Sequence, residues 1–306
     1  MDIRLLPEGP LDVCHTLSRY RIWGEDPANR LGEGVFRRAL ALNGALHGYA
    51  LRWSGPPDDV RLTITIAGSR STRVAEAVCA EVRRLLFLDA DLLGFYRMAK
   101  SDGVLQGLTA PFYGMRPTLA PTPFEMLVGA ITAQQVNLTF ALTTRGRLVR
   151  RFGRPVSVEG ETVHAFPTPE ALARATVRDL RRLKFSTRKA QYIIGLARLV
   201  AEGELAFGRL GSLSNAQVIA ELMRIRGVGC WTAEWFLARA LGRGDVCPAG
   251  DLAIQKCFAH FYGRGQALSD RAIRRRAAAW GQHQHLAVHY LLAGLRRLRA
   301  GPGGGT

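Results

Sequence analysis

The stretch Leu222-Met-Arg-Ile-Arg-Gly-Val-Gly-Cys-Trp-Thr-Ala-Glu-Trp-Phe-Leu237 contains the pattern on which the fold assignment depends. Upstream of it, Ser214-Asn-Ala-Gln217 opens a helix as a capping box, and we expect this helix to end near Ile225. Gly227-Val-Gly229 then makes a turn, and a second helix begins near Cys230. Two glycines at a helix N-terminus leave backbone N–H groups open to a phosphate. Taken alone, the tripeptide is more often a glycine C-cap before an ordinary helix, so the rest of the chain has to decide.

A carboxylate follows the hairpin in the segment Val246-Cys-Pro-Ala-Gly-Asp251. Pro248 and Gly250 interrupt regular structure, and apolar residues at helical spacing come directly after Asp251. The pattern predicts that Asp251 is the N-cap of a helix. A capping carboxylate can also face a cleft, so a second role at a functional site stays open.

Two tryptophans begin the second hairpin helix. Trp231 and Trp235 are four residues apart, so their rings lie on one face of the helix. Such a pair can line a pocket in which an electron-rich indole stacks on a positively charged base. Packing in a core is the more common role of two such rings, and the spacing alone does not separate the two.

The charge balance favours a polyanionic partner. The 306 residues include 42 Lys and Arg against 25 Asp and Glu, a formal net charge of +17. Phosphates neutralised by such side chains release counterions, so nucleic acid is the leading candidate. No apolar run is long enough to span a membrane, and the N-terminus has no secretory signal pattern. We therefore expect a cytoplasmic protein that acts at the bacterial nucleoid, without membrane association.

The first part of the chain mixes strand and helix patterns. Tyr49-Ala-Leu-Arg-Trp53 and Leu62-Thr-Ile-Thr-Ile66 alternate apolar and polar residues as strands do, and residues 55–59 supply a turn. Residues 71–86 have apolar side chains at helical spacing. These patterns predict an N-terminal α+β domain over residues 1–105, with helices packed against a small antiparallel sheet.

Helix starts recur after the prolines that follow residue 105. Thr122-Pro-Phe-Glu125 predicts a capping box, and Thr168-Pro169 marks another start. Strand patterns almost vanish here, so we expect residues 106–300 to form a stack of helices that includes the hairpin at 222–237. Residues 301–306 are rich in Gly and predict a disordered tail.

Three motifs in order resemble one family. They are Phe124-Glu-Met-Leu-Val-Gly-Ala-Ile-Thr-Ala-Gln-Gln-Val136, the hairpin Ile225-Arg-Gly-Val-Gly-Cys-Trp-Thr-Ala233, and Pro248-Ala-Gly-Asp251. On these residues the sequence is similar to the helix-hairpin-helix (HhH-GPD) DNA glycosylases, and most similar to the 3-methyladenine DNA glycosylase II (AlkA-like) group. The resemblance extends more coarsely over most of the chain. It implies an α+β N-terminal domain before a mostly helical glycosylase domain, and an enzyme that flips an alkylated base from double-stranded DNA and hydrolyses its N-glycosidic bond.

The resemblance also implies roles for single residues. Asp251 matches the catalytic aspartate, and Trp231 and Trp235 match aromatic positions of the base pocket. Relatives that also cleave the strand have a nucleophilic lysine at the position of Trp231, so a monofunctional enzyme that leaves an abasic site is expected. Lys256 lies one helical turn beyond Asp251 and is a less favoured candidate to take the place of that nucleophilic lysine. The four-cysteine cluster of other branches is missing, so we expect no bound metal cluster.

The remaining implied residues contact DNA. Gln135 matches the position that fills the gap left by the flipped base, although Gln134 and Gln135 by themselves indicate only a polar corner between helices. The implied DNA contacts are Gln134, Gln135, Lys189, Arg226, Gly227, Val228, Gly229 and Thr232. No cofactor is expected beyond a monovalent cation at the carbonyls of residues 226–229 in a DNA complex, and we expect the protein to be a monomer.

One segment departs from the family pattern. Trp280-Gly-Gln-His-Gln-His285 stands where relatives often have a Pro-aromatic-Arg-Ser run, so we expect the far wall of the pocket to be altered. His283 and His285 are expected to form a polar wall or surface rather than a metal site. A glycosylase with lyase activity on oxidised guanine and a non-catalytic protein that binds damaged DNA remain the alternatives.

Overall fold

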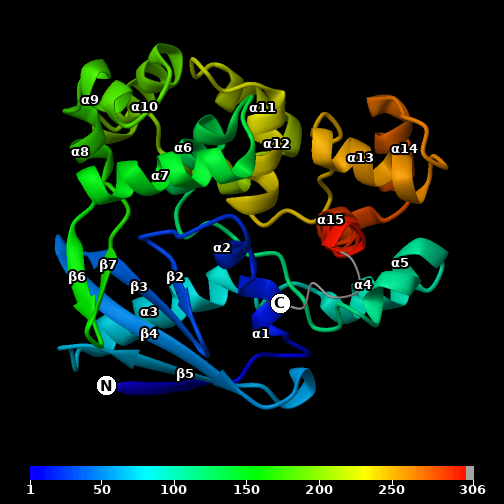
Figure 1. The fold of residues 1–306 in the computed structure, drawn as a ribbon, viewed down its shortest axis with the longest axis horizontal. Coiled ribbons are helices and arrows are strands. Elements are labelled where there is room, and N and C mark those ends of the chain that lie inside the picture. The colour runs from blue at the N-terminus through cyan, green and yellow to red at the C-terminus, as the bar shows by residue number, and fades with distance from the viewer. Residues whose placement is uncertain (301–306) are drawn as a thin grey trace.

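The computed structural model describes residues 1–300, and its N-terminal part is built on one antiparallel sheet (Figure 1). The strand order is β1-β5-β4-β3-β2. The bounds are β1 Asp2–Leu5, β2 Arg30–Gly32, β3 Val35–Leu42, β4 Ala45–Ser54 and β5 Arg61–Ile66. Asn43 and Gly44 both have positive φ and join β3 to β4 as a two-residue hairpin turn. The predicted strands at 49–53 and 62–66 lie in β4 and β5, and the α+β class is confirmed.

Helix α3 (Thr72–Leu85) covers one face of this sheet. Val74, Val78 and Val82 are buried on its inner face, in one cluster with sheet residues such as Leu51 and Ile64. The helix begins one residue after Ser71 and ends one residue before Leu86. The predicted helix is therefore confirmed, because the apolar spacing matched the face that packs on the sheet. Two short helices, α1 (Val13–Leu17) and α2 (Arg19–Ile22), precede β2.

A second hairpin covers the other face of the sheet. Strands β6 (Pro155–Val158) and β7 (Glu161–His164) pair through a turn at Glu159 and Gly160, which both have positive φ. Val158 and Val163 are buried against sheet residues, in a cluster with Val35, Ala39 and Ala50. The expectation that strands vanish after Pro123 was wrong here, because the alternation Val156, Val158, Val163 is short and the surface that buries it is remote in sequence.

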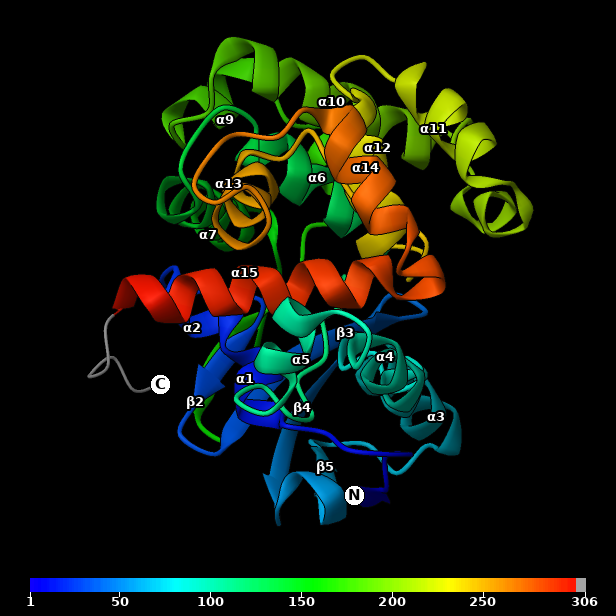
Figure 2. The ribbon, with the colours of Figure 1, turned by 90° about the vertical axis from the view of Figure 1, so that its right-hand side faces the viewer.

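The rest of the chain is helical. The helices are α4 Leu92–Ala99, α5 Gly103–Thr109, α6 Pro123–Ala133, α7 Leu138–Phe152, α8 Pro169–Ala173, α9 Val177–Arg182, α10 Thr187–Ala201, α11 Asn215–Met223, α12 Cys230–Arg239, α13 Leu252–Phe261, α14 Asp270–Ala278 and α15 Gln284–Ala300. Figure 2 shows α15 lying across the molecule, with α13 and α14 on one side and N-terminal elements on the other. None of the helices in residues 1–300 is both long enough and apolar enough to cross a membrane.

Helices α4 and α5 share their core with the C-terminal helices. Phe95 and Leu105 are buried in one cluster with Phe258, Tyr290 and Leu291. The predicted domain boundary at residue 105 falls inside α5. The division into domains 1–105 and 106–300 stays a prediction, and the predicted tail 301–306 lies outside the described residues.

A buried network of charges joins the sheet to α6 and α7. Glu125 accepts from Arg38 of β3 at 2.8 Å and from Arg145 of α7 at 2.6 Å, and Arg145 also pairs with Asp26. Burial raises the pKa of Asp26, but the Arg145 guanidinium and the Asn29 amide outweigh this effect and hold that pKa below its ordinary value. The Thr122 hydroxyl caps α6 as predicted, yet Glu125 does not close the capping box, because its carboxylate is held by the two arginines.

Candidate active site

Helices α11 and α12 form the predicted hairpin, and its two glycines have different roles. Gly227 has φ +92°, and a Cβ there would lie 2.3 Å from Cγ of Tyr192, so no other residue fits without displacing the ring. Gly229 has an ordinary φ of −105° and open space beside it, and it is the N-cap of α12. Its exposed position leaves the first N–H groups of α12 accessible. Helix α11 ends at Met223, two residues before the predicted end, and its capping box at Ser214 and Gln217 is confirmed.

Gln134 fastens the end of α6 to this hairpin. Its Nε2 donates to the carbonyl oxygen of Gly227 at 2.8 Å and to Oγ1 of Thr232 at 3.2 Å. Gln134 and the buried Thr232 therefore hold the hairpin from inside, as does Val228, which is also buried. In the protein alone these side chains stabilise the hairpin, and their contacts with DNA stay predictions.

Gln135 is the exposed tip between α6 and α7. Its φ of +55° is rare for a residue with a side chain, and it turns the chain before Asn137 caps α7. Val136, Leu138 and Phe140, which follow, are large apolar residues left exposed. A protruding glutamine on an apolar loop fits the predicted insertion into a DNA gap.

Lys189 and Arg226 occupy different environments. The Lys189 Nζ donates to the carbonyl oxygen of Thr132 at 2.8 Å, and partial burial lowers its pKa. Lys189 therefore links α10 to α6 and does not extend freely into solvent. Arg226 is exposed on the hairpin turn, with its guanidinium carbon 5.8 Å from the centre of the Tyr192 ring.

The hairpin carbonyls expected to hold a monovalent cation have partners already. The oxygen of Gly227 accepts from Gln134, and that of Gly229 accepts from the N–H of Ala233. A carbonyl oxygen has two lone pairs, so each retains one for a cation. These residues fit such an ion, and its binding stays a prediction.

Asp251 is hydrogen-bonded to both α12 and α13. Its Oδ1 accepts from the backbone N–H groups of Ala253 at 2.8 Å and Ile254 at 3.2 Å, so it caps α13 as predicted. Its Oδ2 accepts from the indole N–H of Trp231 at 2.8 Å and of Trp235 at 3.1 Å. Both indoles reach one oxygen because they lie one helical turn apart. Four donors thus fix the orientation of one carboxylate.

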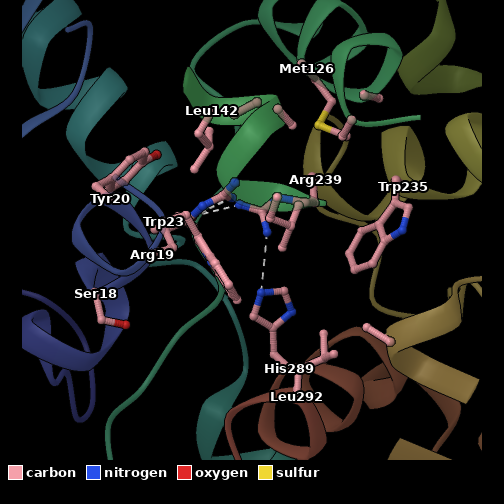
Figure 3. Close-up of a pocket in the computed structure, with 18 of the residues that line it drawn as sticks. Ser18, Arg19, Tyr20, Trp23, Met126, Leu142, Trp235, Arg239, His289 and Leu292 are labelled. Carbon is pink, nitrogen blue, oxygen red and sulfur yellow. Dashed lines mark hydrogen bonds between the residues drawn. The ribbon is translucent and has the colours of Figure 1, made fainter. Parts of the chain in front are cut away.

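This carboxylate lines a pocket of about 510 Å³. The pocket extends from Asp251 and the two indoles toward α15 and α2, and Figure 3 shows Trp235, Arg239 and His289 around it. Trp231 and Trp235 therefore line the pocket, as the resemblance implied, and Trp235 also packs against two hydrophobic clusters of the core. Lys256 also lines the pocket and is exposed.

Comparison with known proteins identifies the family of this chain. Residues 128–283 match the model of the HhH-GPD superfamily base excision DNA repair proteins. A DNA-3-methyladenine glycosylase of Bacillus subtilis (strain 168) is 33% identical over 216 residues, 71% of this chain and 71% of the relative. The chain belongs to the HhH-GPD superfamily.

Two further HhH-GPD relatives cover more of the chain. DNA-3-methyladenine glycosylase 2 of Escherichia coli (strain K12) is 29% identical over 236 residues, 77% of this chain and 78% of the relative. The solved structure of a 3-methyladenine DNA glycosylase from Archaeoglobus fulgidus has a TM-score of 0.86 at 27% identity, and the match covers 97% of this chain and 99% of that one. The AlkA-like resemblance is therefore confirmed.

The far wall of this HhH-GPD pocket differs from the expectation. The segment 280–285 does not line it; the wall comes from α15, through residues such as His289 and Leu292. His285 is buried beside Phe87, neither a surface nor a pocket wall, and burial lowers its pKa to about 4. Trp280 is buried as well and donates to Asp102 at 3.1 Å. The expectation of a polar wall or surface was wrong for His285, because the chain before α15 turns its side chain into the core, whereas His283 is only half-buried and remains at the surface.

Arg239 and His289 are site residues that the sequence reasoning missed. Arg239 lies on the same face of α12 as Trp231 and Trp235, at the next i, i+4 position, which is a signal that was available. His289 has no comparable signal, because only the packing of α15 across α12 brings it into the pocket. The two side chains are 3.5 Å apart, between Nη1 of Arg239 and Nε2 of His289.

Proposed function

We propose that this protein is a monofunctional DNA N-glycosylase that removes alkylated bases from double-stranded DNA by hydrolysis and leaves an abasic site. The observation that carries the proposal is the Asp251 carboxylate, held by two indole N–H groups and two backbone N–H groups at the edge of a pocket. The names of the relatives support the same reaction.

The carboxylate supplies what cleavage of an N-glycosidic bond needs. As the base departs with the bonding electron pair, positive charge develops on the sugar. A fixed carboxylate stabilises this charge without reorganising, because its four donors already orient it. Water adds to C1′ as the base departs, and the proton that the water releases passes to the departed base or to solvent.

The surface around the pocket binds the DNA. The open N–H groups at the start of α12 bind a backbone phosphate, assisted by the helix dipole. Gln135 enters the space that the flipped nucleotide leaves. The net charge of +17 supplies general attraction to phosphates. If the protein contacts six to ten phosphates, its affinity falls by roughly 10³–10⁵ between 50 and 200 mM salt, and a flat response would contradict this mode of binding.

The lyase alternative requires a nucleophilic amine. The hairpin position carries Trp231, whose indole nitrogen is used as a donor to Asp251. Lys256 is exposed at the pocket and is the one amine to test. Treatment with borohydride traps a covalent adduct between a lysine and the abasic sugar, so an adduct that disappears in Lys256→Gln would establish the lyase in place of our proposal.

The proposal is tested by single-turnover excision on duplexes that each contain one damaged base. Strand scission that appears only after alkali, with no borohydride adduct, is the expected result. Scission without alkali would indicate a lyase. Tight binding with no abasic product for any lesion would favour the non-catalytic protein instead.

A further inference from the structure

The pocket has a second polar end, opposite to Asp251. Nη2 of Arg239 donates to Oγ1 of Thr118 at 2.8 Å, and Nη1 of Arg19 donates to the same oxygen at 3.3 Å. Within residues 1–300, neither guanidinium has a carboxylate partner among the salt bridges. Two arginines that converge on one neutral hydroxyl repel each other, so a partner with an acceptor or negative charge relieves the site.

His289 orients Arg239 at this end of the pocket. A guanidinium can only donate, so Nε2 of His289 accepts from Arg239 and the ring proton lies on Nδ1. Nδ1 is buried and is not accessible from the pocket. Burial, with the nearby His285, Arg296 and Arg19, lowers the pKa of His289 well below its ordinary value, against the opposing effect of a hydrogen bond to the His285 backbone. The ring is therefore neutral at pH 7 and serves as the acceptor that orients Arg239.

The carboxylates of the wall do not offset these cations. Glu125 and Asp26 line the pocket, but they pair with Arg38 and Arg145. Asp251 lies at the other end with the indoles and Lys256. The carboxylate is therefore where the sugar must lie, and the two guanidinium groups that converge on Thr118 belong to the end where the far edge of a base must lie.

We propose that Arg239, oriented by His289, selects damaged bases that carry no positive charge and stabilises the negative charge on such a base as it leaves. The inference rests on the proposed function and goes beyond it, because it extends the substrates from alkylated bases to other damaged bases that are neutral. Arg239 lies one helical turn beyond Trp235 on the same face of α12. A guanidinium within about 6 Å of a base disfavours a cationic base on the order of 10- to 100-fold at the effective dielectric constant of a protein surface.

The chemistry of departure gives the same preference. A neutral base leaves with the C1′–N electron pair as an anion, which the Arg239 guanidinium stabilises. Water then adds to C1′, and the proton that it releases neutralises the departed base. A base with a fixed positive charge leaves neutral and gains nothing from this guanidinium.

The test compares Arg239→Gln with wild type on two duplexes, one with hypoxanthine, which is neutral, and one with 7-methylguanine, which is cationic. We expect Arg239→Gln to lower the single-turnover rate for hypoxanthine about 100-fold and to leave the rate for 7-methylguanine unchanged or higher. Arg275→Gln removes an equal charge from the exposed face of α14 and is the matched control. An equal fall for both bases, or no change in their ratio, would overturn the inference.

Two further measurements keep the test decisive. If Arg239→Gln does not fold, as judged by thermal unfolding, His289→Leu should still lower the hypoxanthine rate selectively. If wild type releases neither base, tryptophan fluorescence decides the inference by itself, whereas the proposed function fails only if no alkylated base is released from any duplex. Wild type should then bind free 9-methylhypoxanthine more tightly than 3,9-dimethyladeninium, and Arg239→Gln should lose that preference. Equal binding of the two by wild type would refute it.

Discussion

The two ends of the pocket differ in charge and in how the chain builds them. The Asp251 end is anionic and comes from α12 and α13, which are consecutive helices. The Arg239 end is rich in donors and combines α12 with α15, α2 and Thr118, which are distant in sequence. The first end performs a step that every damaged base needs, whereas the second end distinguishes between bases. Reaction type and substrate choice are thus separated in space along one face of α12.

A change outside both ends should affect DNA binding alone. In Gly227→Ala, the new Cβ would meet the Tyr192 ring at 2.3 Å in a backbone with φ +92°, so the hairpin has to shift. We expect DNA affinity to fall by about 100-fold, while the ratio of rates between neutral and cationic bases stays the same. Fluorescence anisotropy with a labelled duplex measures the affinity.

Gly229→Ala is the control for this change, because a Cβ there meets open space. Its affinity should stay within about threefold of wild type. A loss as large as that of Gly227→Ala would mean that close approach of the DNA, rather than the shape of the hairpin, dominates both positions.

Replacing His285, whose ring contacts that of His289, should alter the pH dependence of the free energy of unfolding. The pKa of the buried His285 is about 4 in the folded protein, and an unfolded histidine has about 6.5. The unfolded state therefore binds a proton first as the pH falls, so stability present above pH 6.5 is lost progressively toward pH 4. Protonation of this group alone should lower the free energy of unfolding by about 2 kcal/mol between pH 7 and pH 5.

His285→Leu removes that titration. Urea unfolding at pH 7 and pH 5 should show a difference in the free energy of unfolding that is smaller than in wild type by about 2 kcal/mol. An identical pH dependence in the two proteins would contradict the burial of a neutral ring at this position.

A change at the anionic end should affect all bases equally. Trp231→Phe and Trp235→Phe each remove one N–H donor from Oδ2 of Asp251. We expect each to lower the single-turnover rate about tenfold, the value of one hydrogen bond to a charged group, on hypoxanthine and 7-methylguanine alike. A fall confined to one of the two bases would show that the indoles select bases instead of orienting the carboxylate.

Local chain geometry explains which features were predictable. The cap at Asp251, the turn at Gly227 and the shared face of Trp231 and Trp235 depend on residues close in sequence, and all three predictions are confirmed. The hydrogen bonds from both indoles to one carboxylate oxygen were not predicted, because they depend on the angle between α12 and α13.

Packing between distant segments explains what was missed. The β6–β7 hairpin is stabilised by the sheet that it covers, and Glu125 leaves its capping box for arginines of β3 and α7. His289 reaches the pocket from α15 and meets Arg239 of α12, and His285 is buried beside Phe87, which is distant in sequence. Such placements follow from the assembled core and leave no periodic trace in the sequence.

The most direct test of the account is Asp251→Asn, measured for both chemistry and binding. Asn is a good N-cap, so α13 should remain intact, while the charge and the acceptor for the two indoles are lost. We predict a single-turnover excision rate at least 10³-fold below wild type for every base, with duplex affinity within about threefold and an unchanged melting temperature. A variant that binds DNA normally and still excises a base at a rate near that of wild type would contradict the central role of the carboxylate.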